Sequence, residues 1–478
     1  MTTFSKFSTH IQSKWMILIV AAMGNLVLTV DSGLMPVTYP ELAAVFDTDT
    51  STILWISVAF WVTTVGLAMT IGWLVDVRDK RNIYTLGFII FSIALILASV
   101  TSSLWQLILV RIFMGFGSAM ILAGVNAIIV DSFHGHERAK AIGFAGAVVG
   151  IGLSGGPIFG GFLLDHLDWR SIFYCRIPIS LVAALLSWLV LKKQSNPGHM
   201  KLKIEWIGVV SLFACLGSLI LIFNRGAAVG WGSPIVLIMA IVLFISLPIL
   251  FQYQRKSKRP ILDLPLFKTT GYGFGLIVLM CHYISLGAIM LLAPFFFIDY
   301  LEFSATKAGA FIMLYSLMRV FIAPFTGYIL RLISPWHLSA IGLLLICGSL
   351  VWLSFLSISG SETNILIALL LIGIGSGIYE PSNTLTIMSS APSDRYGTAS
   401  ASIASGRQLA FALGVAMCGA INAGRERLYN AGEINQYDYL SLSFSDALIA
   451  CAAFAGLGLI LSFVAANRDS RTIKKREI

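Results

Sequence analysis

Apolar residues in this chain gather in long runs separated by short polar segments. An α-helix needs roughly 20 apolar residues to cross the hydrocarbon core of a bilayer, and most of the runs approach or exceed that length. The runs lie at about 15–38, 53–72, 83–100, 107–129, 139–163, 171–191, 205–224, 235–252, 271–297, 307–330, 337–357, 364–389, 398–423 and 445–467. The pattern therefore predicts an all-α membrane protein with about fourteen spans.

Composition agrees with a membrane environment. Hydrophobic residues make up 57% of the 478 residues, charged residues only 12%, and the mean hydropathy is +0.87. A soluble domain carries roughly 25% charged residues, so this chain has too little polar surface to face water on all sides. The net charge of +9 does not indicate nucleic acid as a partner, because the basic residues lie in short loops between the runs. The first run is too long for the ~7–15-residue core of a secretory signal.

The basic residues also predict an orientation. Most of the 32 Lys and Arg lie in the loops on the side of the two termini, which the positive-inside rule places in the cytoplasm. We therefore expect a multi-pass protein of the inner (cytoplasmic) membrane with both termini cytoplasmic. The two most basic loops flank the seventh and eighth runs, which we interpret as an inserted pair. The expected units are a six-span bundle at 1–191, two additional spans with cytoplasmic linkers at 192–268, and a second six-span bundle at 269–478.

No residue pattern indicates catalysis. The six Cys fall in or at the ends of apolar runs without any CxxC pair, so we expect small buried hydrophobic residues rather than metal or redox centres. The one His cluster, His134 and His136 beside Glu137, lies in a short loop and lacks further ligands. We expect no enzyme activity, no metal and no cofactor.

The loop after the second run, GWLVDVRDKRNIY, contains Gly72, Asp76, Arg78 and Arg81. It resembles the signature loop of the major facilitator superfamily, commonly Gly-x-Leu-x-Asp-x-x-Gly-Arg-Arg. Glycine permits close helix contact, and a carboxylate with cations can interact with helix ends. Asp79 stands where the superfamily usually has a second Gly, which puts the geometry of that turn in question.

The fifth run contains the most specific motif. It fits Gly-x8-Gly-x3-Gly-Pro-x2-Gly-Gly through Gly143, Gly152, Gly156, Pro157, Gly160 and Gly161. Small residues on one helix face let backbones approach closely, and proline bends a helix. Within the superfamily this element resembles the mark of exporters that exchange substrate for protons; Gly-rich packing alone is the alternative interpretation.

Three further stretches narrow the resemblance. VDSGLMPVTYP contains Asp31, RIFMGFGSA begins with Arg111, and WRSIFYCRIP has Arg176 where Asn is usual. The chain resembles the fourteen-span drug:proton antiporters of the EmrB/QacA type. That resemblance implies the major facilitator fold: two six-helix bundles around a central cavity, plus two extra helices packed outside. It also implies proton-coupled efflux of small amphipathic compounds such as drugs, driven by the proton gradient. The implied partners are a small-molecule substrate and the lipid bilayer; a periplasmic adaptor is left open.

Three charges are expected at similar depth in the first bundle. Asp31 lies about 10 Å from the nearer end of its run at 1.5 Å per residue, and Arg111 and Arg176 lie near the same ends of theirs. A charge inside a span costs roughly 2.5–3.5 kcal/mol, so it should face a cavity or a partner. We expect Asp31 to couple proton movement, with Arg111 tuning it. A static Asp31–Arg111 pair is the alternative.

The second bundle contains further embedded polar residues. Glu380 and Arg407 are expected to pair, Arg319 has no visible partner, and His282 is more typical of a hydrogen-bonded packing residue than of a proton relay. With Arg176, these four are predicted to line the substrate cavity. Embedded Arg outnumber embedded carboxylates, which favours neutral, zwitterionic or anionic cargo. The alternatives are therefore a dedicated exporter of an anionic metabolite, such as a siderophore or organic acid, or lipid translocation.

Overall fold

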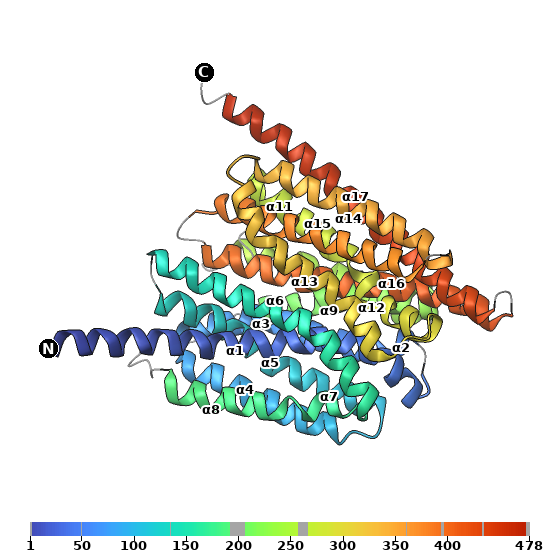
Figure 1. Ribbon diagram of the computed structural model, residues 1–478, viewed down its shortest axis with the longest axis horizontal. Helices are drawn as coiled ribbons and strands as arrows, with labels where there is room; N and C mark the ends of the chain where they lie inside the picture. Colours follow the sequence, from blue (N-terminus) through green and yellow to red (C-terminus); the bar gives the residue numbers. More distant parts are fainter. Residues whose placement is uncertain are drawn as a thin grey trace.

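The chain folds as a bundle of long helices, seen in a computed structural model that describes residues 2–48, 50–133, 135–191, 206–256, 266–359, 361–392, 396–432 and 435–474 (Figure 1). The first part forms α1 (Thr2–Val45), α2 (Thr50–Ile53), α3 (Trp55–Val77), α4 (Lys80–Ser99), α5 (Leu104–Ser132), α6 (Gly135–His166), α7 (Ser171–Tyr174) and α8 (Ile177–Val190). The middle forms α9 (Trp206–Val229) and α10 (Pro234–Lys256). The last part forms a 3-10 turn (Leu266–Lys268), α11 (Thr270–Ser285), α12 (Gly287–Phe295), a π-helical turn (Phe296–Tyr300), α13 (Ala305–Ile329), α14 (Pro335–Ser359), α15 (Glu362–Ser389), α16 (Tyr396–Asn430) and α17 (Gln436–Lys474).

Twelve segments within the described residues are long and apolar enough to cross a membrane. The fourteen predicted from the sequence are therefore not confirmed. The two remaining positions, the second and seventh runs, are occupied by α3 and α9. Within the described residues their apolar stretches are Trp55–Ala68 and Val210–Leu219, and both end where the side chains of the next residues lie outside the described part.

The helices form two bundles with the same packing pattern. In the N-terminal half, α1 packs against α6, α5 packs against both α3 and α4, and α4 packs against α8. In the C-terminal half, α11 packs against α16, α15 against both α13 and α14, and α14 against α17. Figure 1 shows the two halves side by side, blue to green below and yellow to red above. Two halves with one pattern are what an internally repeated transporter fold produces.

The bundles contact each other most extensively through α6 and α13. A Cβ atom on Gly161 would lie only 2.2 Å from the carbonyl oxygen of Ala305, and one on Gly309 only 2.2 Å from that of Pro157. Glycine is required at such positions because any larger residue would push the two backbones apart. At the same end, Asp165 accepts hydrogen bonds from the backbone N–H groups of Ala305 (3.0 Å) and Thr306 (2.8 Å). A carboxylate of one bundle thus caps the first turn of a helix in the other.

Helices α9 and α10, predicted from the sequence as an inserted pair, lie against both bundles through α9. Helix α9 packs against α3 of the N-terminal half and α16 of the C-terminal half, and its main neighbour is α10. The contact with α3 includes Phe213, whose ring lies over Gly66. Helix α10 exposes a series of large apolar side chains, including Phe244. Such a face suits contact with lipid.

Candidate functional site

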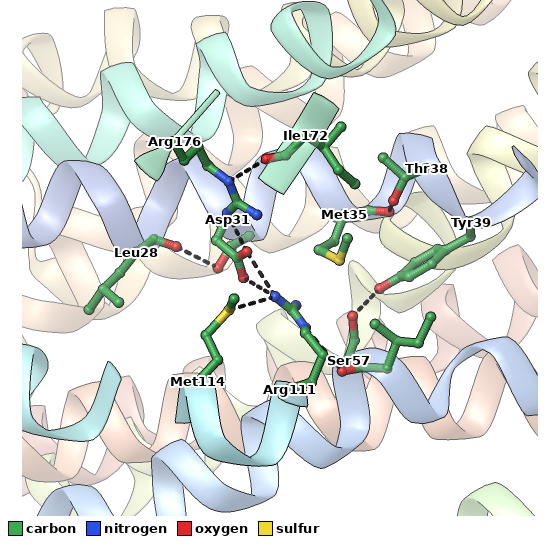
Figure 2. A network of polar contacts seen from close by, with 12 residues as sticks. Leu28, Asp31, Met35, Thr38, Tyr39, Ser57, Arg111, Met114, Ile172 and Arg176 are labelled. Carbon is green, nitrogen blue, oxygen red and sulfur yellow. Dashed lines mark hydrogen bonds and ion pairs between the residues drawn. The ribbon is translucent and has the colours of Figure 1, made fainter. Parts of the chain in front are cut away.

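The N-terminal bundle contains a buried polar cluster centred on Asp31 (Figure 2). Asp31 comes from α1, Arg111 from α5, and Arg176 from the junction between α7 and α8. Nη1 of Arg111 donates to both carboxylate oxygens, at 2.9 Å and 3.1 Å, and Nη1 of Arg176 donates to Oδ1. Only 1% of Asp31 is exposed, and both arginines are buried. One carboxylate therefore holds two guanidinium groups away from solvent.

Each arginine also donates from Nε to a backbone carbonyl oxygen, whereas Nη2 of Arg176 has no hydrogen-bond partner among the described residues. Nε of Arg111 donates to the carbonyl oxygen of Ile56 at 3.3 Å, and its guanidinium lies 4.6 Å from the ring centre of Phe60. Nε of Arg176 donates to the carbonyl oxygen of Ile172 at 2.7 Å. These contacts fix both guanidinium groups in place, with Asp31 between them (Figure 2).

The position of Arg176 follows from a break in the helix. Pro178 stands in the first turn of α8, and proline fits that position because its missing N–H needs no partner there. The chain therefore separates into α7 and α8, with Arg176 at the junction. The sequence placed Asp31 and Arg111 at one depth, and the two do meet. It also placed Arg176 in the substrate cavity, but in this conformation Arg176 is buried against Asp31.

The C-terminal bundle contains a second polar cluster, centred on Glu380 of α15. Oε1 of Glu380 accepts hydrogen bonds from Nη1 of Arg319 on α13, at 3.2 Å, and from the hydroxyl of Tyr283 on α11. Nε2 of His282 lies 4.0 Å from the same oxygen. The Glu380 side chain is 25% exposed, whereas Asp31 is almost completely enclosed. The two embedded carboxylates thus have different access to their surroundings.

Two sequence predictions about this cluster are wrong. Arg319 does have a partner, because Glu380 binds it. Arg407 of α16 was expected to hold Glu380, but its guanidinium lies over the ring of Tyr283, 5.3 Å from the ring centre, and no described ion pair joins it to Glu380. The cause is a close helix contact: a Cβ on Gly377 would lie 2.8 Å from the carbonyl oxygen of Arg319. Gly377 is one turn before Glu380, so this contact brings α13 to the carboxylate.

His282 also differs from its predicted role. Its ring is fully buried and packs against Tyr283 and Tyr379, with ring centres 4.8 Å and 4.3 Å away. The sequence predicted a hydrogen-bonded packing residue, but neither ring nitrogen has a hydrogen-bond partner among the described residues. Tyr283, which links His282, Glu380 and Arg407, carried no signal in the sequence, because a tyrosine in an apolar run is typical of core packing.

In the signature loop, the described side-chain contacts lie at the start of α4. Asp79, which replaces the usual glycine, adopts φ −64° and caps α4 by accepting from the N–H of Arg81 at 3.1 Å. That backbone conformation is open to any residue, so the turn does not need glycine. Arg81 lies 3.9 Å above the ring centre of Trp188, and Arg78 is exposed. A Cβ on Gly72 would have no described atom within 4 Å, so Gly72 makes no close contact with the described part of the chain. The side chain of Asp76 lies outside the described residues.

The glycine-rich motif of α6 faces two helices. Gly152 and Gly156 approach α1, where added Cβ atoms would lie 2.1 Å from Oγ1 of Thr29 and 2.8 Å from Cα of Gly33. Gly160 also faces α1 at Leu34, whereas Gly161 faces α13. Pro157 lies inside α6 without ending it. Gly143 lies within α6, and its contacts are outside the described part of the structure. The motif therefore lets α6 pack tightly between α1 and the opposite bundle.

Comparison with known proteins identifies the family. Residues 21–415 match the Major Facilitator Superfamily. The chain belongs to this superfamily. It is 28% identical to the riboflavin transporter RibZ of Clostridioides difficile over 97% of this chain and 100% of that protein. It is 24% identical to the multidrug resistance protein Stp of Mycobacterium tuberculosis over 85% of this chain and 75% of that protein.

A solved structure of the same fold supports the assignment. A bacterial homologue of the human lysosomal transporter Spinster, in an inward-facing and unoccupied conformation, matches with a TM-score of 0.68. The match covers 95% of this chain and 97% of that one at 15% identity. The chain is therefore a multi-pass superfamily transporter and not an enzyme. The finer likeness to fourteen-span drug:proton antiporters stays a prediction.

Proposed function

We propose that this chain exports small amphipathic organic compounds, including drugs, in exchange for protons across the cytoplasmic membrane. The observation that carries the proposal is the glycine-proline motif of α6, which packs against α1 on one side and α13 on the other. Among superfamily transporters this motif resembles the mark of antiporters. The similarity to a multidrug resistance protein over most of the chain gives independent support.

We further propose that α3 and α9 complete fourteen spans. They contain 23 and 24 residues, which corresponds to roughly 35 Å of helix at 1.5 Å per residue. That length is sufficient for the hydrocarbon core. With fourteen spans and both termini cytoplasmic, the end where Asp165 caps α13 is the outer end. The conformation described here is then closed towards the outside.

A second candidate cargo is riboflavin or a similar heteroaromatic metabolite. It is favoured by the full-length alignment with a riboflavin transporter. The alternative of a dedicated exporter of an anionic metabolite loses most of its support, because Arg176 and Arg319 each bind a carboxylate of the protein. Those two guanidinium groups need no anionic cargo to balance them.

Purified protein in liposomes tests the proposal. Ethidium transport is followed with an imposed pH gradient, without a gradient, and with a protonophore; riboflavin is tested in parallel. We expect transport against the ethidium gradient only when protons move in the opposite direction, since each proton supplies ~1.4 kcal/mol per unit of pH difference. Riboflavin transport without ethidium transport would favour the second cargo. Movement of either compound at the same rate in all three conditions would contradict proton coupling.

A further inference from the structure

The two embedded carboxylates, Asp31 and Glu380, differ in how many cations bind them and in how exposed they are. We propose that Glu380 binds and releases the coupled proton and that Asp31 is a structural lock between the helices of the N-terminal bundle. The proposal rests on proton-coupled transport as the proposed function. It identifies which carboxylate serves that transport.

Asp31 is poorly suited to exchange a proton. Both of its oxygens accept hydrogen bonds from guanidinium groups, and 1% of the residue is exposed. With Asp31 ionised, the cluster of Asp31, Arg111 and Arg176 has a charge of +1. Protonation would leave two buried guanidinium groups without a counter-charge, and an uncompensated buried charge is among the most expensive changes in a protein. Asp31 is therefore expected to stay ionised throughout the transport cycle.

Glu380 has a different arrangement. Its described contacts converge on Oε1, and a quarter of the side chain is exposed. One guanidinium group, that of Arg319, bonds to it. A proton arriving from water can bind the carboxylate and break the Arg319 bond; when the proton leaves to water on the other side, the bond forms again. Arg319 thus acts as an internal cation that takes the place of the proton.

His282 is placed to accept a hydrogen bond from Glu380 when Glu380 is protonated. Its two ring nitrogens have no hydrogen-bond partner among the described residues, and Nε2 is 4.0 Å from Oε1 of Glu380. A buried polar atom without a partner costs free energy. When Glu380 is protonated, its O–H can donate to Nε2 after a small shift, so the imidazole gains its missing partner. His282 then stabilises proton binding without touching solvent.

The charged and titratable groups around Glu380 come from four helices. They are His282 and Tyr283 on α11, Tyr315 and Arg319 on α13, Tyr379 on α15, and Arg407 on α16. Among them are two guanidinium groups and no second carboxylate, so the surroundings are cationic when Glu380 is protonated. A cationic environment opposes proton binding, and replacing Arg407 by Gln should shift the pH dependence of transport towards higher pH.

Infrared difference spectroscopy of the full-length protein in lipid tests the proposal without any cargo. The carbonyl stretch of a protonated carboxylic acid is compared between alkaline and mildly acidic buffer. We expect a band in the parent protein that is lost in Glu380→Gln and kept in Asp31→Asn. If Asp31→Asn does not fold, the double variant Asp31→Asn with Arg176→Asn replaces it. Glu362→Gln is the matched control, because Glu362 is an exposed carboxylate of the same helix bound to Lys307.

Transport assays of Glu380→Gln and the spectrum and pH profile of His282→Phe complete the test. Glu380→Gln should lose gradient-driven ethidium transport at least tenfold but keep ethidium exchange between equal concentrations, which needs no net proton movement. His282→Phe keeps the ring packing and should move the carbonyl band and the pH profile. A band that survives Glu380→Gln, disappears in Asp31→Asn, or is absent from the parent would overturn the proposal. Absence of ethidium transport by the parent would count against the proposed function alone.

Discussion

At the residue scale, the two polar clusters show that the depth of a side chain in its span can be predicted from the sequence, whereas the direction in which it points cannot. The sequence gives the depth of a side chain in its span, and this was enough to bring Asp31 and Arg111 together. It does not give the direction in which the side chain points, so Arg319 was left without a partner although Glu380 lies beside it. That direction depends on which helix faces touch, and here α15 meets α13 through close approaches at Gly373 and Gly377.

Removal of the Asp31 charge should destabilise the protein. Asp31→Asn leaves Arg111 and Arg176 buried without a carboxylate, and breaking a buried ion pair from one side typically costs about 3–5 kcal/mol. We expect a clear fall in the thermal unfolding midpoint in detergent. Asp168→Asn is the control, because Asp168 is exposed and should change stability by less than about 0.5 kcal/mol. Equal midpoints for Asp31→Asn and the parent would contradict a structural lock.

At the element scale, α6 determines how the two bundles meet. Its glycine motif was predicted from the sequence, and the close contacts of Gly152 and Gly156 with α1 agree with that prediction. The contact of Gly161 with Ala305 and the capping role of Asp165 had no sequence signal. Both depend on the start of α13 lying beside the end of α6, and residues 140 positions apart in the chain give no local pattern for that.

Asp165 should stabilise the closed end of the transporter. Its carboxylate accepts two backbone N–H groups of α13, while an amide side chain has one oxygen to offer. Losing one exposed hydrogen bond of this kind costs roughly 1 kcal/mol, which corresponds to about a fivefold change in the balance between closed and open states. We expect Asp165→Asn to raise the open population, measured as spin-label distances between the ends of α6 and α13.

The comparison variant for this test is again Asp168→Asn. Asp168 lies near the same end but accepts from the N–H of Arg170 in its own bundle, so its removal should leave the distance distribution unchanged. A shift of equal size in both variants would mean that lost surface charge, and not the capping of α13, changes the balance.

At the scale of the whole molecule, the motifs made the family recognisable from the sequence, while the span count was not settled. Hydrophobic runs predict helices well, because the bilayer enforces a minimum apolar length. The count stays open at α3 and α9, which lie at the junction of the two bundles and pack against each other, because the described apolar stretch of each helix ends where the side chains of the next residues lie outside the described part. The sequences of both helices are free of charged residues up to Asp76 and Arg225, so their length and composition are compatible with membrane spans.

Cysteine labelling from outside the cell distinguishes the possible topologies. With fourteen spans and cytoplasmic termini, the loop between α4 and α5 is outside and the loop between α13 and α14 is inside. If α3 and α9 do not span, the loop between α4 and α5 moves to the inside, and the loop between α13 and α14 stays inside.

Ser102 and Leu332 are exposed residues of these two loops, and the native cysteines are buried or half-buried and can be replaced. We expect a membrane-impermeant maleimide to label Ser102→Cys in intact cells and Leu332→Cys only after permeabilisation. Labelling of neither in intact cells would favour twelve spans, and labelling of Leu332→Cys alone would place the termini outside.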